Sequence, residues 1–283
     1  MSSRAVLITG CSSGIGAATA ARLAAGGWTV YATARRPETL ADLEAQGCTT
    51  LTLDVTDEAS CRAAVEAVEA AEGAVGVLIN NAGYSQSGAV ESVPDERVRA
   101  QFETNVFGLL RMCRLVLPKM REQGWGRIVN ISSMGGEFTF PGGGVYHATK
   151  YAIEALSDAL RYEVEDFGVD VVVIQPGLIK TPFSTRTVAE IDAVAAHAGP
   201  YHEFNAAVAD ASKSAYEKGL VAKLGGPPEA VAKVIEKALA ADRPKTRYKV
   251  TPSAHAFMRL HSLVPDRTWD RLMRGSFPRP RAR

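Results

Sequence analysis

The sequence contains only four cysteines among its 283 residues, and they lie far apart. None belongs to a CxxC pair, so their spacing fits reduced thiols better than a zinc site or a disulfide framework. The histidines are equally scattered: His197 and His202 are five residues apart, and His255 and His261 are six apart, so neither pair shares a helix face at i, i+4. We therefore expect no metal site. The cysteines are Cys11, Cys48, Cys61 and Cys113.

Long hydrophobic runs and a large net charge are also missing. No segment approaches the roughly 18 uncharged apolar residues that a membrane-spanning helix needs, and the first apolar run, 5–8, is too short for a secretory signal. The 32 Lys and Arg against 31 Asp and Glu leave a net charge of +1, which argues against nucleic-acid binding through bulk charge. We expect a cytoplasmic protein with no transmembrane segment and no nucleic-acid partner.

What the sequence does contain is an alternation of short β-rich runs with helical stretches, which is typical of parallel strands joined by crossover helices. Several runs consist almost wholly of Val, Ile and Leu, as expected for strands covered on both faces. The expected strands are Ala5–Thr9, Thr29–Thr33, Thr50–Asp54, Val75–Asn80, Arg127–Ile131, Val169–Gln175 and Tyr248–Thr251.

Helical apolar spacing fills most of the intervals between these runs. Asp57 is a candidate helix cap, and Pro94 lies near a helix start. No Pro- or Ser-rich linker and no repeat divides the chain. The pattern predicts a single α/β domain over residues 1–283, a doubly wound Rossmann-type sheet of about seven parallel strands with helices on both faces. The expected helices lie near 15–26, 57–73, 95–123 and 146–167.

A glycine-rich segment, Thr9–Gly16, follows the first expected strand and opens the first helix with the spacing GxxxGxG. Glycines at such a turn let the backbone approach a diphosphate, whose charge the N–H groups of the helix start then face. A glycine-rich turn without a ligand is the alternative, and the flanking strand and helix favour a dinucleotide site. Its candidate contacts are Gly10, Ser12, Ser13, Gly14, Ile15 and Gly16.

The end of the second expected strand indicates which dinucleotide binds. Sites for NAD usually place an Asp or Glu there for the ribose hydroxyls. This strand ends instead in Ala34-Arg35-Arg36, with no carboxylate before Glu38. Because guanidinium groups make charge-assisted, forked hydrogen bonds to phosphate, we expect NADP(H), with Arg35 as the primary contact to the 2′-phosphate, Arg36 as a secondary one, and Ser12 as a further donor. A solvated pair of arginines is the alternative.

A phenol and an ammonium group lie four residues apart in Tyr146-His147-Ala148-Thr149-Lys150, on one face of an expected helix. A free Tyr has a pKa near 10, and a nearby cation favours the phenolate, so the pair can serve in acid–base catalysis. Such a pair alone is a weak signal. Ser133, at the end of the run RIVNISS, and Asn105 strengthen it.

These motifs together resemble the short-chain dehydrogenase/reductase family. In the family's order, the matching pieces span most of residues 5–183: TGCSSGIG at 9–16, LDVTD around Asp54, Asn80-Asn81-Ala82-Gly83, Asn105, Ser133, Tyr146 with Lys150, and Pro176-Gly177 followed by Ile179 and Thr181. Within the family, ITGCSSGIG with YATARR is similar to the NADP(H)-preferring hydroxysteroid and retinol dehydrogenase-like branch.

The resemblance implies a catalytic role for four of these residues. Tyr146 would exchange a proton with the substrate oxygen while hydride moves at the nicotinamide, and Lys150 would bind the nicotinamide ribose and lower the pKa of Tyr146. Ser133 would donate a hydrogen bond to the developing alkoxide. Asn105 would hold a water that links Lys150 to solvent. The implied reaction interconverts a secondary alcohol and a ketone or aldehyde, a small-molecule substrate.

The resemblance also assigns the remaining cofactor contacts. Asp54 and Val55 match positions that bracket the adenine, and the segment Asn81, Ala82 and Gly83 passes behind the adenosine ribose. Pro176 and Gly177 precede Ile179 and Thr181, which match contacts to the carboxamide.

The segment 183–222 is expected to cover the substrate with helices. Its apolar residues suit a lipophilic alcohol or ketone such as a steroid or retinoid, contacted by Phe183, Ser133 and Tyr146, although the same residues would serve equally to pack two helices onto the domain. Met134, Phe138 and Phe140 are ambiguous between pocket wall and core. The apolar residues of the segment include Ile191, Val194, Tyr201, Phe204, Val208 and Tyr216.

Two other functions stay open. One is a dinucleotide-sensing binding protein with vestigial catalysis, against which the intact Tyr146 and Lys150 argue. The other, an epimerase or dehydratase, usually needs a larger substrate domain. The resemblance also implies a homodimer or homotetramer through the apolar faces of the helices near 95–123 and 146–167.

The small net charge conceals an uneven distribution. Residues 243–283 hold eleven Lys and Arg but only Asp266 and Asp270, a net +9, which leaves −8 on residues 1–242. Basic residues beside Phe257, Trp269 and Leu272 are compatible with a peripheral membrane contact. We favour instead helices packed near the substrate entrance, followed by a basic disordered tail at 276–283.

Overall fold

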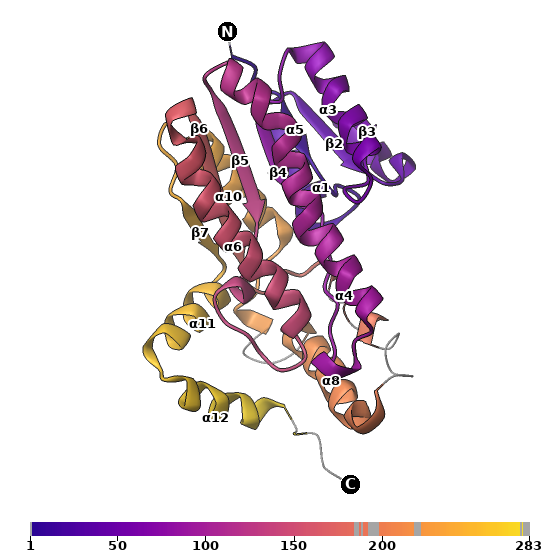
Figure 1. The fold of residues 1–283 in the computed structure, drawn as a ribbon, viewed down its shortest axis with the longest axis vertical. Helices are drawn as coiled ribbons and strands as arrows, with labels where there is room; N and C mark the ends of the chain where they lie inside the picture. Colours follow the sequence, from indigo (N-terminus) through magenta and orange to yellow (C-terminus); the bar gives the residue numbers. More distant parts are fainter. Residues whose placement is uncertain are drawn as a thin grey trace.

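Seven parallel strands form one sheet, in the order β3-β2-β1-β4-β5-β6-β7, in the computed structural model of the chain (Figure 1). Every strand overlaps one of the expected runs, so the predicted doubly wound α/β fold is confirmed. The strands are β1 (Val6–Ile8), β2 (Val30–Ala34), β3 (Thr49–Thr52), β4 (Val77–Asn80), β5 (Gly126–Ile131), β6 (Val169–Pro176) and β7 (Arg247–Val250). The structure describes residues 2–183, 187, 189–191, 198–217, 222–277 and 279.

Helices cover both faces of the sheet. One face carries α1 (Gly14–Ala25), α2 (Ala41–Ala45) and α10 (Pro228–Ala240), and the other carries α3 (Glu58–Glu72), α5 (Gly108–Glu122) and α6 (Gly144–Val164). Further helices lie beyond the carboxyl ends of the strands, at the bottom of Figure 1. These are α4 (Asp95–Phe102), α8 (His202–Glu217), α11 (Pro252–Leu263) and α12 (Asp266–Ser276).

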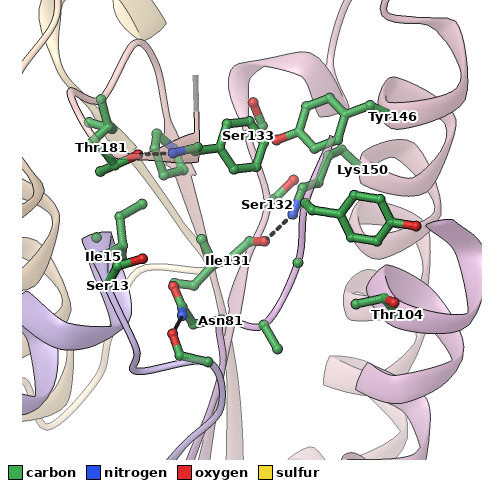
Figure 2. Close-up of a pocket in the computed structure, with 18 of the residues that line it drawn as sticks. Ser13, Ile15, Asn81, Thr104, Ile131, Ser132, Ser133, Tyr146, Lys150 and Thr181 are labelled. Atoms are coloured by element: carbon green, nitrogen blue, oxygen red, sulfur yellow. Dashed lines mark hydrogen bonds between the residues drawn. The ribbon is translucent and has the colours of Figure 1, made fainter. Parts of the chain in front are cut away.

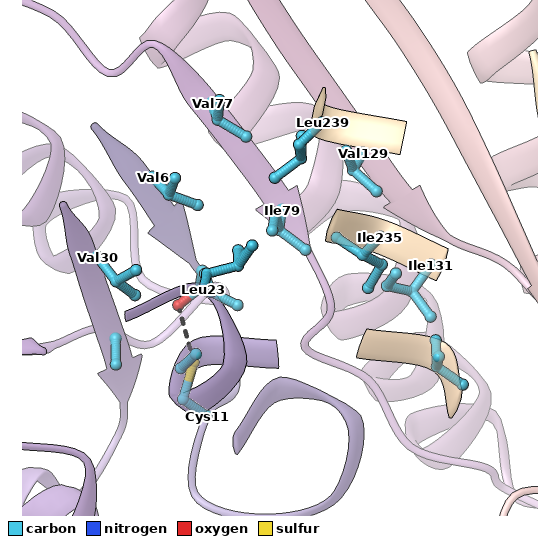
Figure 3. Packing of buried hydrophobic residues seen from close by; sticks show 14 of the residues in the cluster. Val6, Cys11, Leu23, Val30, Val77, Ile79, Val129, Ile131, Ile235 and Leu239 are labelled. Carbon is cyan, nitrogen blue, oxygen red and sulfur yellow. Dashed lines mark hydrogen bonds between the residues drawn. The ribbon is translucent and has the colours of Figure 1, made fainter. Parts of the chain in front are cut away.

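Alternate side chains of each central strand belong to different hydrophobic clusters. On β1, Val6 and Ile8 pack toward α1 and α10, whereas Leu7 packs toward α3 and α5, and all three are fully buried. Figure 3 shows the first cluster, in which Leu23 of α1 and Ile235 of α10 lie over the strands. Burial on both faces explains why the strands are continuous apolar runs rather than alternating ones.

The strand order changes direction at β1. Strands β2 and β3 lie on one side of it, and β4 to β7 lie on the other. This strand pairs with β2 on one side and with β4 on the other, with Ile8 opposite Ala32 and Ile79. The connections after β1 and β4 therefore leave on opposite faces of the sheet. In open α/β sheets, such a switch point opens a crevice at the carboxyl ends of the strands.

The expected helix over 95–123 is interrupted. A π-helical turn, η3 (Glu103–Phe107), separates α4 from α5 and contains the predicted site residue Asn105. The apolar spacing did not predict this turn, because one wider turn changes the hydrophobic period too little to register. The cap prediction is confirmed, since Asp57 Oδ1 accepts a hydrogen bond from Ala59 N at 2.9 Å.

The structure describes only part of the segment 183–222 and of the C-terminal segment 276–283. Within 183–222, Ile191, Phe204 and Val208 are buried in a cluster with Ala89. These apolar residues therefore pack this segment, including α8, against the rest of the domain. Most of the predicted tail 276–283 lies outside the described residues. Within the described part of the chain, no helix combines the length and the apolar character that crossing a bilayer requires.

Arg127 on β5 fixes the end of α10 beneath the sheet. Its side chain is 4% exposed, and Nη1 donates to the carbonyl oxygens of Ala238, Leu239 and Ala241 at 2.8–3.0 Å. Nη2 donates to Asp170 Oδ2 at 2.8 Å. A buried cation thus satisfies the last carbonyl groups of the helix.

Replacing this cation tests its structural role. We expect Arg127→Met to lower the free energy of unfolding by about 3 kcal/mol, because the carbonyl groups at the end of α10 lose a charged donor in a buried place. Asp170→Asn is the matched control and should cost about 1 kcal/mol or less, since Asp170 is 44% exposed. Urea denaturation measures both, and equal losses would contradict this account.

Candidate active site

Most of the predicted site residues line one cavity of about 400 Å³ at the carboxyl ends of the strands. Figure 2 shows Ser13, Ile15 and Thr181 on one side of it, and Tyr146 and Lys150 on the other. This volume lies within the range of small-molecule sites. The predicted residues that line it are Gly10, Ser12, Ser13, Gly14, Ile15, Arg35, Asp54, Val55, Asn81, Ala82, Gly83, Ser133, Tyr146, Lys150, Pro176, Gly177, Ile179, Thr181 and Phe183.

Three predicted residues do not line the cavity. Gly16 lies behind the glycine loop, where a Cβ would stand 2.4 Å from Gly10 O and 2.5 Å from Asn81 Nδ2, so it serves the close packing of α1 on the loop. Arg36 is exposed and precedes the 3₁₀ turn η1 (Pro37–Leu40). Asn105 is buried one layer deeper.

Hydrogen bonds from the neighbouring strand hold the glycine loop. Asn81 Nδ2 donates to the carbonyl oxygens of Thr9 and Gly10, both at 2.9 Å, and Thr9 Oγ1 accepts from the backbone N–H groups of Asn81 and Ala82, both at 3.0 Å. Gly10 has a φ of +74°, and a Cβ there would lie 2.9 Å from Ala82 Cα. The two loops at the switch point are therefore locked together, and only glycine fits between them.

One end of the cavity is formed by Arg35 after β2 and by Asp54 and Val55 after β3. Arg35 is exposed at the cavity's edge, and the described lining there holds no carboxylate besides Asp54. Asp54 Oδ1 accepts hydrogen bonds from the backbone N and Oγ1 of Thr56 at 2.9 and 2.8 Å, which fixes the carboxylate. Arg35 thus supplies positive charge where the sequence predicts a 2′-phosphate.

The acid–base candidates converge from β5 and α6. Lys150 Nζ lies 5.6 Å from the centre of the Tyr146 ring and donates to Ile131 O, the last residue of β5, at 2.8 Å. Ser133 follows that strand, and its Oγ accepts from Gly135 N at 3.0 Å, which fixes its side chain. The end of β5 therefore positions both the ammonium group and the hydroxyl beside Tyr146.

Burial sets the charge properties of Lys150, which is 7% exposed. Desolvation lowers the pKa of Lys150 from 10.5 to about 8, against the opposing influence of the Glu154 carboxylate one turn further along α6. Glu154 is itself buried and accepts hydrogen bonds from Gln175 Nε2 at 3.0 Å and Arg247 Nε at 2.9 Å. The site thus holds an amine whose protonation changes close to neutral pH.

Asn105 reaches the same helix from the π-helical turn. Its Oδ1 accepts from Tyr84 N at 3.2 Å, and its Nδ2 donates to Tyr84 O and to Thr149 Oγ1, both at 3.0 Å. Thr149 precedes Lys150 on α6. Asn105 therefore ties η3 and the segment after β4 to the helix that carries Tyr146 and Lys150.

The opposite end of the cavity is apolar. The ring of Phe183 lies 5.7 Å from that of Tyr146, and Met134 and Phe140 also line this end. Phe138, which the sequence left ambiguous, is 3% exposed and belongs to the core, where its ring lies edge-on to Trp269. The site thus combines a polar, glycine-rich half with an apolar half, separated by Tyr146.

Several lining residues carried no recognisable sequence signal. His147 is the most informative, because burial lowers its pKa to about 4 and keeps it neutral beside Tyr146. Its position next to Tyr146 in the sequence was the one available clue. Further examples are Tyr84, Thr104, Ser132, Leu178 and Pro182.

Cys11 lies within the glycine loop but away from any reactive environment. It is 1% exposed, its Sγ donates to Ile8 O at 3.4 Å, and burial raises the pKa of the thiol to about 12. It fills the turn as a small buried side chain. Among the residues that the structure describes, no group of His, Cys, Asp and Glu is arranged to hold a metal ion.

A comparison with models of known protein families identifies the family of this chain. Residues 4–192 match the model of the short chain dehydrogenase family. The chain belongs to the short-chain dehydrogenase family. The family resemblance inferred from the motifs is thus confirmed, and the chain is an oxidoreductase of this family with a nucleotide-binding Rossmann fold.

Individual relatives extend along most of the chain. It is 37% identical to an NADPH-dependent 3-dehydrocapnine reductase of Ornithobacterium rhinotracheale, over 95% of each chain. It is 42% identical to a 3-ketodihydrosphingosine reductase of Bacteroides thetaiotaomicron, over 68% of this chain and 70% of the relative. The crystal structure of a short-chain dehydrogenase from Streptomyces avermitilis is 36% identical and superposes with a TM-score of 0.76, covering 97% of this chain and 99% of that one.

The buried amine of Lys150 predicts a pH-dependent contribution to stability. Because its folded-state pKa lies below its ordinary value, the folded protein carries the penalty of a buried cation below about pH 8, and this penalty fades as pH rises toward 10.5. Relative to Lys150→Met, the wild type should therefore gain about 2 kcal/mol in unfolding free energy between pH 7 and pH 10. Urea denaturation of both proteins without cofactor measures this difference, and a pH-independent difference would refute the burial argument.

Proposed function

We propose that this protein is an NADP(H)-dependent reductase of lipophilic ketones, interconverting a ketone or aldehyde and the corresponding alcohol by hydride transfer. The observation that carries the proposal is the convergence of Ser133, Tyr146 and Lys150 at the middle of one cavity, with the glycine loop on one side and an apolar wall on the other. This arrangement allows a dinucleotide and an apolar carbonyl compound to meet at Tyr146.

The residues present fit NADP(H). Gly14 begins α1 at the wall of the cavity, and a Cβ there would lie 3.3 Å from Thr181 Cβ, so the glycine keeps space open at the N-terminus of this helix, which suits a diphosphate. Arg35 lines the cavity where the 2′-phosphate of NADP(H) is expected and where an NAD site would carry a carboxylate. The NADPH dependence of the 3-dehydrocapnine reductase supports the same choice.

In the proposed reaction, bound NADPH supplies the hydride to the carbonyl carbon. Tyr146 gives its phenolic proton to the carbonyl oxygen as negative charge develops there, and Ser133 Oγ donates a hydrogen bond to the same oxygen. Lys150 stabilises the Tyr146 phenolate that remains, since its ammonium group lies 5.6 Å from the ring centre.

Asn105 has a positioning role in this proposal. Its hydrogen bonds to Tyr84 and Thr149 hold α6, which carries both Tyr146 and Lys150, against the segment after β4. Asn105 would also hold the water through which Lys150 regains a proton from solvent. Both roles keep the acid–base pair ready for the next turnover.

An apolar substrate fits the second half of the cavity. Met134, Phe140, Leu178 and Phe183 supply its surface, and the region holds few polar groups besides His147 and Ser133. The two relatives described above are named as reductases of 3-ketodihydrosphingosine and of 3-dehydrocapnine, which supports a ketone as the substrate. The apolar lining favours a lipophilic ketone over a sugar. A steroid or retinoid, suggested by the motif YATARR, belongs to the same chemical class.

We further propose a homodimer or homotetramer in which α5 and α6 of two subunits pack together. Phe107 is 50% exposed, Tyr151 42% and Tyr162 85%, and they lie at or along these helices. Apolar side chains exposed on adjacent helices are typical of subunit interfaces.

Cofactor preference tests the assignment of Arg35. We expect the wild type to show a lower KM for NADPH than for NADH, and Arg35→Ala to raise the KM for NADPH by 10- to 100-fold, since a charge-assisted hydrogen bond to phosphate is lost. Arg36→Ala is the matched control, and because Arg36 does not line the cavity its effect should be smaller. Steady-state kinetics with both cofactors gives these values; a wild type that favours NADH would rule out the assignment.

The acid–base assignment predicts a separation of binding from turnover. Tyr146→Phe should lower kcat by about 10²- to 10⁴-fold, because the proton donor is removed, and should change the dissociation constant for NADPH by less than about threefold. Fluorescence titration and steady-state turnover of a lipophilic ketone measure the two quantities. Near-normal turnover in this variant would be incompatible with the mechanism.

A further inference from the structure

A second cavity, of about 430 Å³, lies next to the catalytic one and is not used by the mechanism above. It is bounded by the segment after η4 (Met134–Gly136), by α8 and by α12. Phe140 lines both cavities, so the two share a wall. We call the second one the α12 groove.

Aromatic rings connect the groove to the catalytic tyrosine. The His147 ring lies 5.6 Å from the Tyr146 ring and 4.3 Å, edge-on, from Phe140. Phe140 in turn stacks on Phe277, with the ring centres 6.4 Å apart and the planes 6° from parallel. An alkyl chain leaving the carbonyl at Tyr146 would therefore find a continuous apolar surface into the groove.

The groove is a fixed part of the fold, because α12 is anchored. Trp269 is 6% exposed, and its Nε1 donates to Thr139 O at 3.1 Å. Its ring packs edge-on against Phe138 at 5.2 Å and against His261 of α11 at 4.9 Å. The walls of the groove are largely apolar, with Phe204, Met273 and Phe277 among them.

The rim of the groove is basic. Arg274 and Arg279 line it together with one acid, Asp270, so the rim carries one net positive charge. Among the ion pairs of the described residues, none includes either arginine. Two exposed guanidinium groups at the end of an apolar channel complement an acidic group at the end of an apolar chain.

We propose that the α12 groove binds the extended apolar arm of the substrate, and that Arg274 and Arg279 bind an anionic group on that arm. The substrate class is thus an amphiphilic ketone: a carbonyl at Tyr146, a hydrocarbon chain over Phe140 and Phe277, and a carboxylate or comparable acid at the rim. This inference rests on the proposed ketone reductase activity and names its substrate. It also gives the basic C-terminal segment a role in recognition.

A matched substrate series tests the inference. Methyl ketones of increasing chain length are prepared with the chain ending in a carboxylate, in its methyl ester or in a primary amine, and kcat/KM is measured for each with NADPH. We expect kcat/KM to rise with chain length, and the longest carboxylate to exceed its ester by about fivefold, as expected for exposed ion pairs. Short ketones test the reductase activity itself.

Variants assign the preference to the rim. In the double variant Arg274→Gln, Arg279→Gln, the carboxylate-to-ester ratio should fall to about 1 through a higher KM for the carboxylate, with little change in kcat. Arg274→Glu with Arg279→Glu should favour the amine instead, an outcome that a merely structural role would not produce. Arg271→Gln is the control, because Arg271 is exposed on the same helix but does not line the groove; its ratio should equal that of the wild type.

Distinct results would overturn the inference and the proposed function. Two results with active enzyme overturn the α12 groove as a substrate site. One is that kcat/KM does not rise with chain length, and the other is that the double variant leaves the carboxylate-to-ester ratio unchanged. A third result would also overturn the groove as a substrate site. If the wild type binds phosphatidylglycerol vesicles, and the double variant loses this binding but keeps the wild-type carboxylate-to-ester ratio, the rim binds a membrane surface instead. Failure to reduce any ketone, short ones included, overturns the proposed function and the inference with it.

Discussion

The site depends on one topological constraint: β1 lies between β2 and β4, so that the connections after β1 and β4 diverge to opposite faces of the sheet. Asn81 and Thr9 close the gap between these connections with hydrogen bonds to backbone groups. The glycine loop can therefore come close to its neighbour without losing buried hydrogen bonds. The resulting crevice opens at the carboxyl ends of the strands, and it determines where a dinucleotide would lie.

The half of the crevice around Tyr146 depends on the end of β5. Ile131 O accepts a hydrogen bond from Lys150 Nζ, and Ser133 follows two residues later, so one strand positions both partners of Tyr146. Burying the lysine lowers its pKa toward neutrality, and the Glu154 carboxylate, itself held by Gln175 and Arg247, opposes this shift. The fold therefore gives up stability to place a titratable amine beside the phenol, a compromise common at catalytic sites.

The fold and the core of the site were predictable from local patterns. Continuous apolar runs predict buried strands, the glycine spacing predicts a strand-to-helix turn, and the Tyr–Lys pair predicts two side chains on one helix face. What was missed leaves no trace in such local patterns. The ranking of Arg35 above Arg36 is not among the misses, because it agrees with the lining of the cavity, which includes Arg35 and not Arg36. The π-helical turn at Asn105 is too short to change the hydrophobic period. The α12 groove depends on the contact of Trp269 with Thr139, 130 residues away.

The central claim, that this crevice carries out hydride transfer rather than dinucleotide sensing, can be tested by one isotope measurement. A lipophilic ketone is incubated with NADPH that carries deuterium at the reacting carbon of the nicotinamide ring, and the product is analysed by mass spectrometry. We predict an alcohol with a single deuterium on the carbinol carbon. Tight binding of NADPH without any deuterated alcohol, across ketones of different size and charge, would contradict the account.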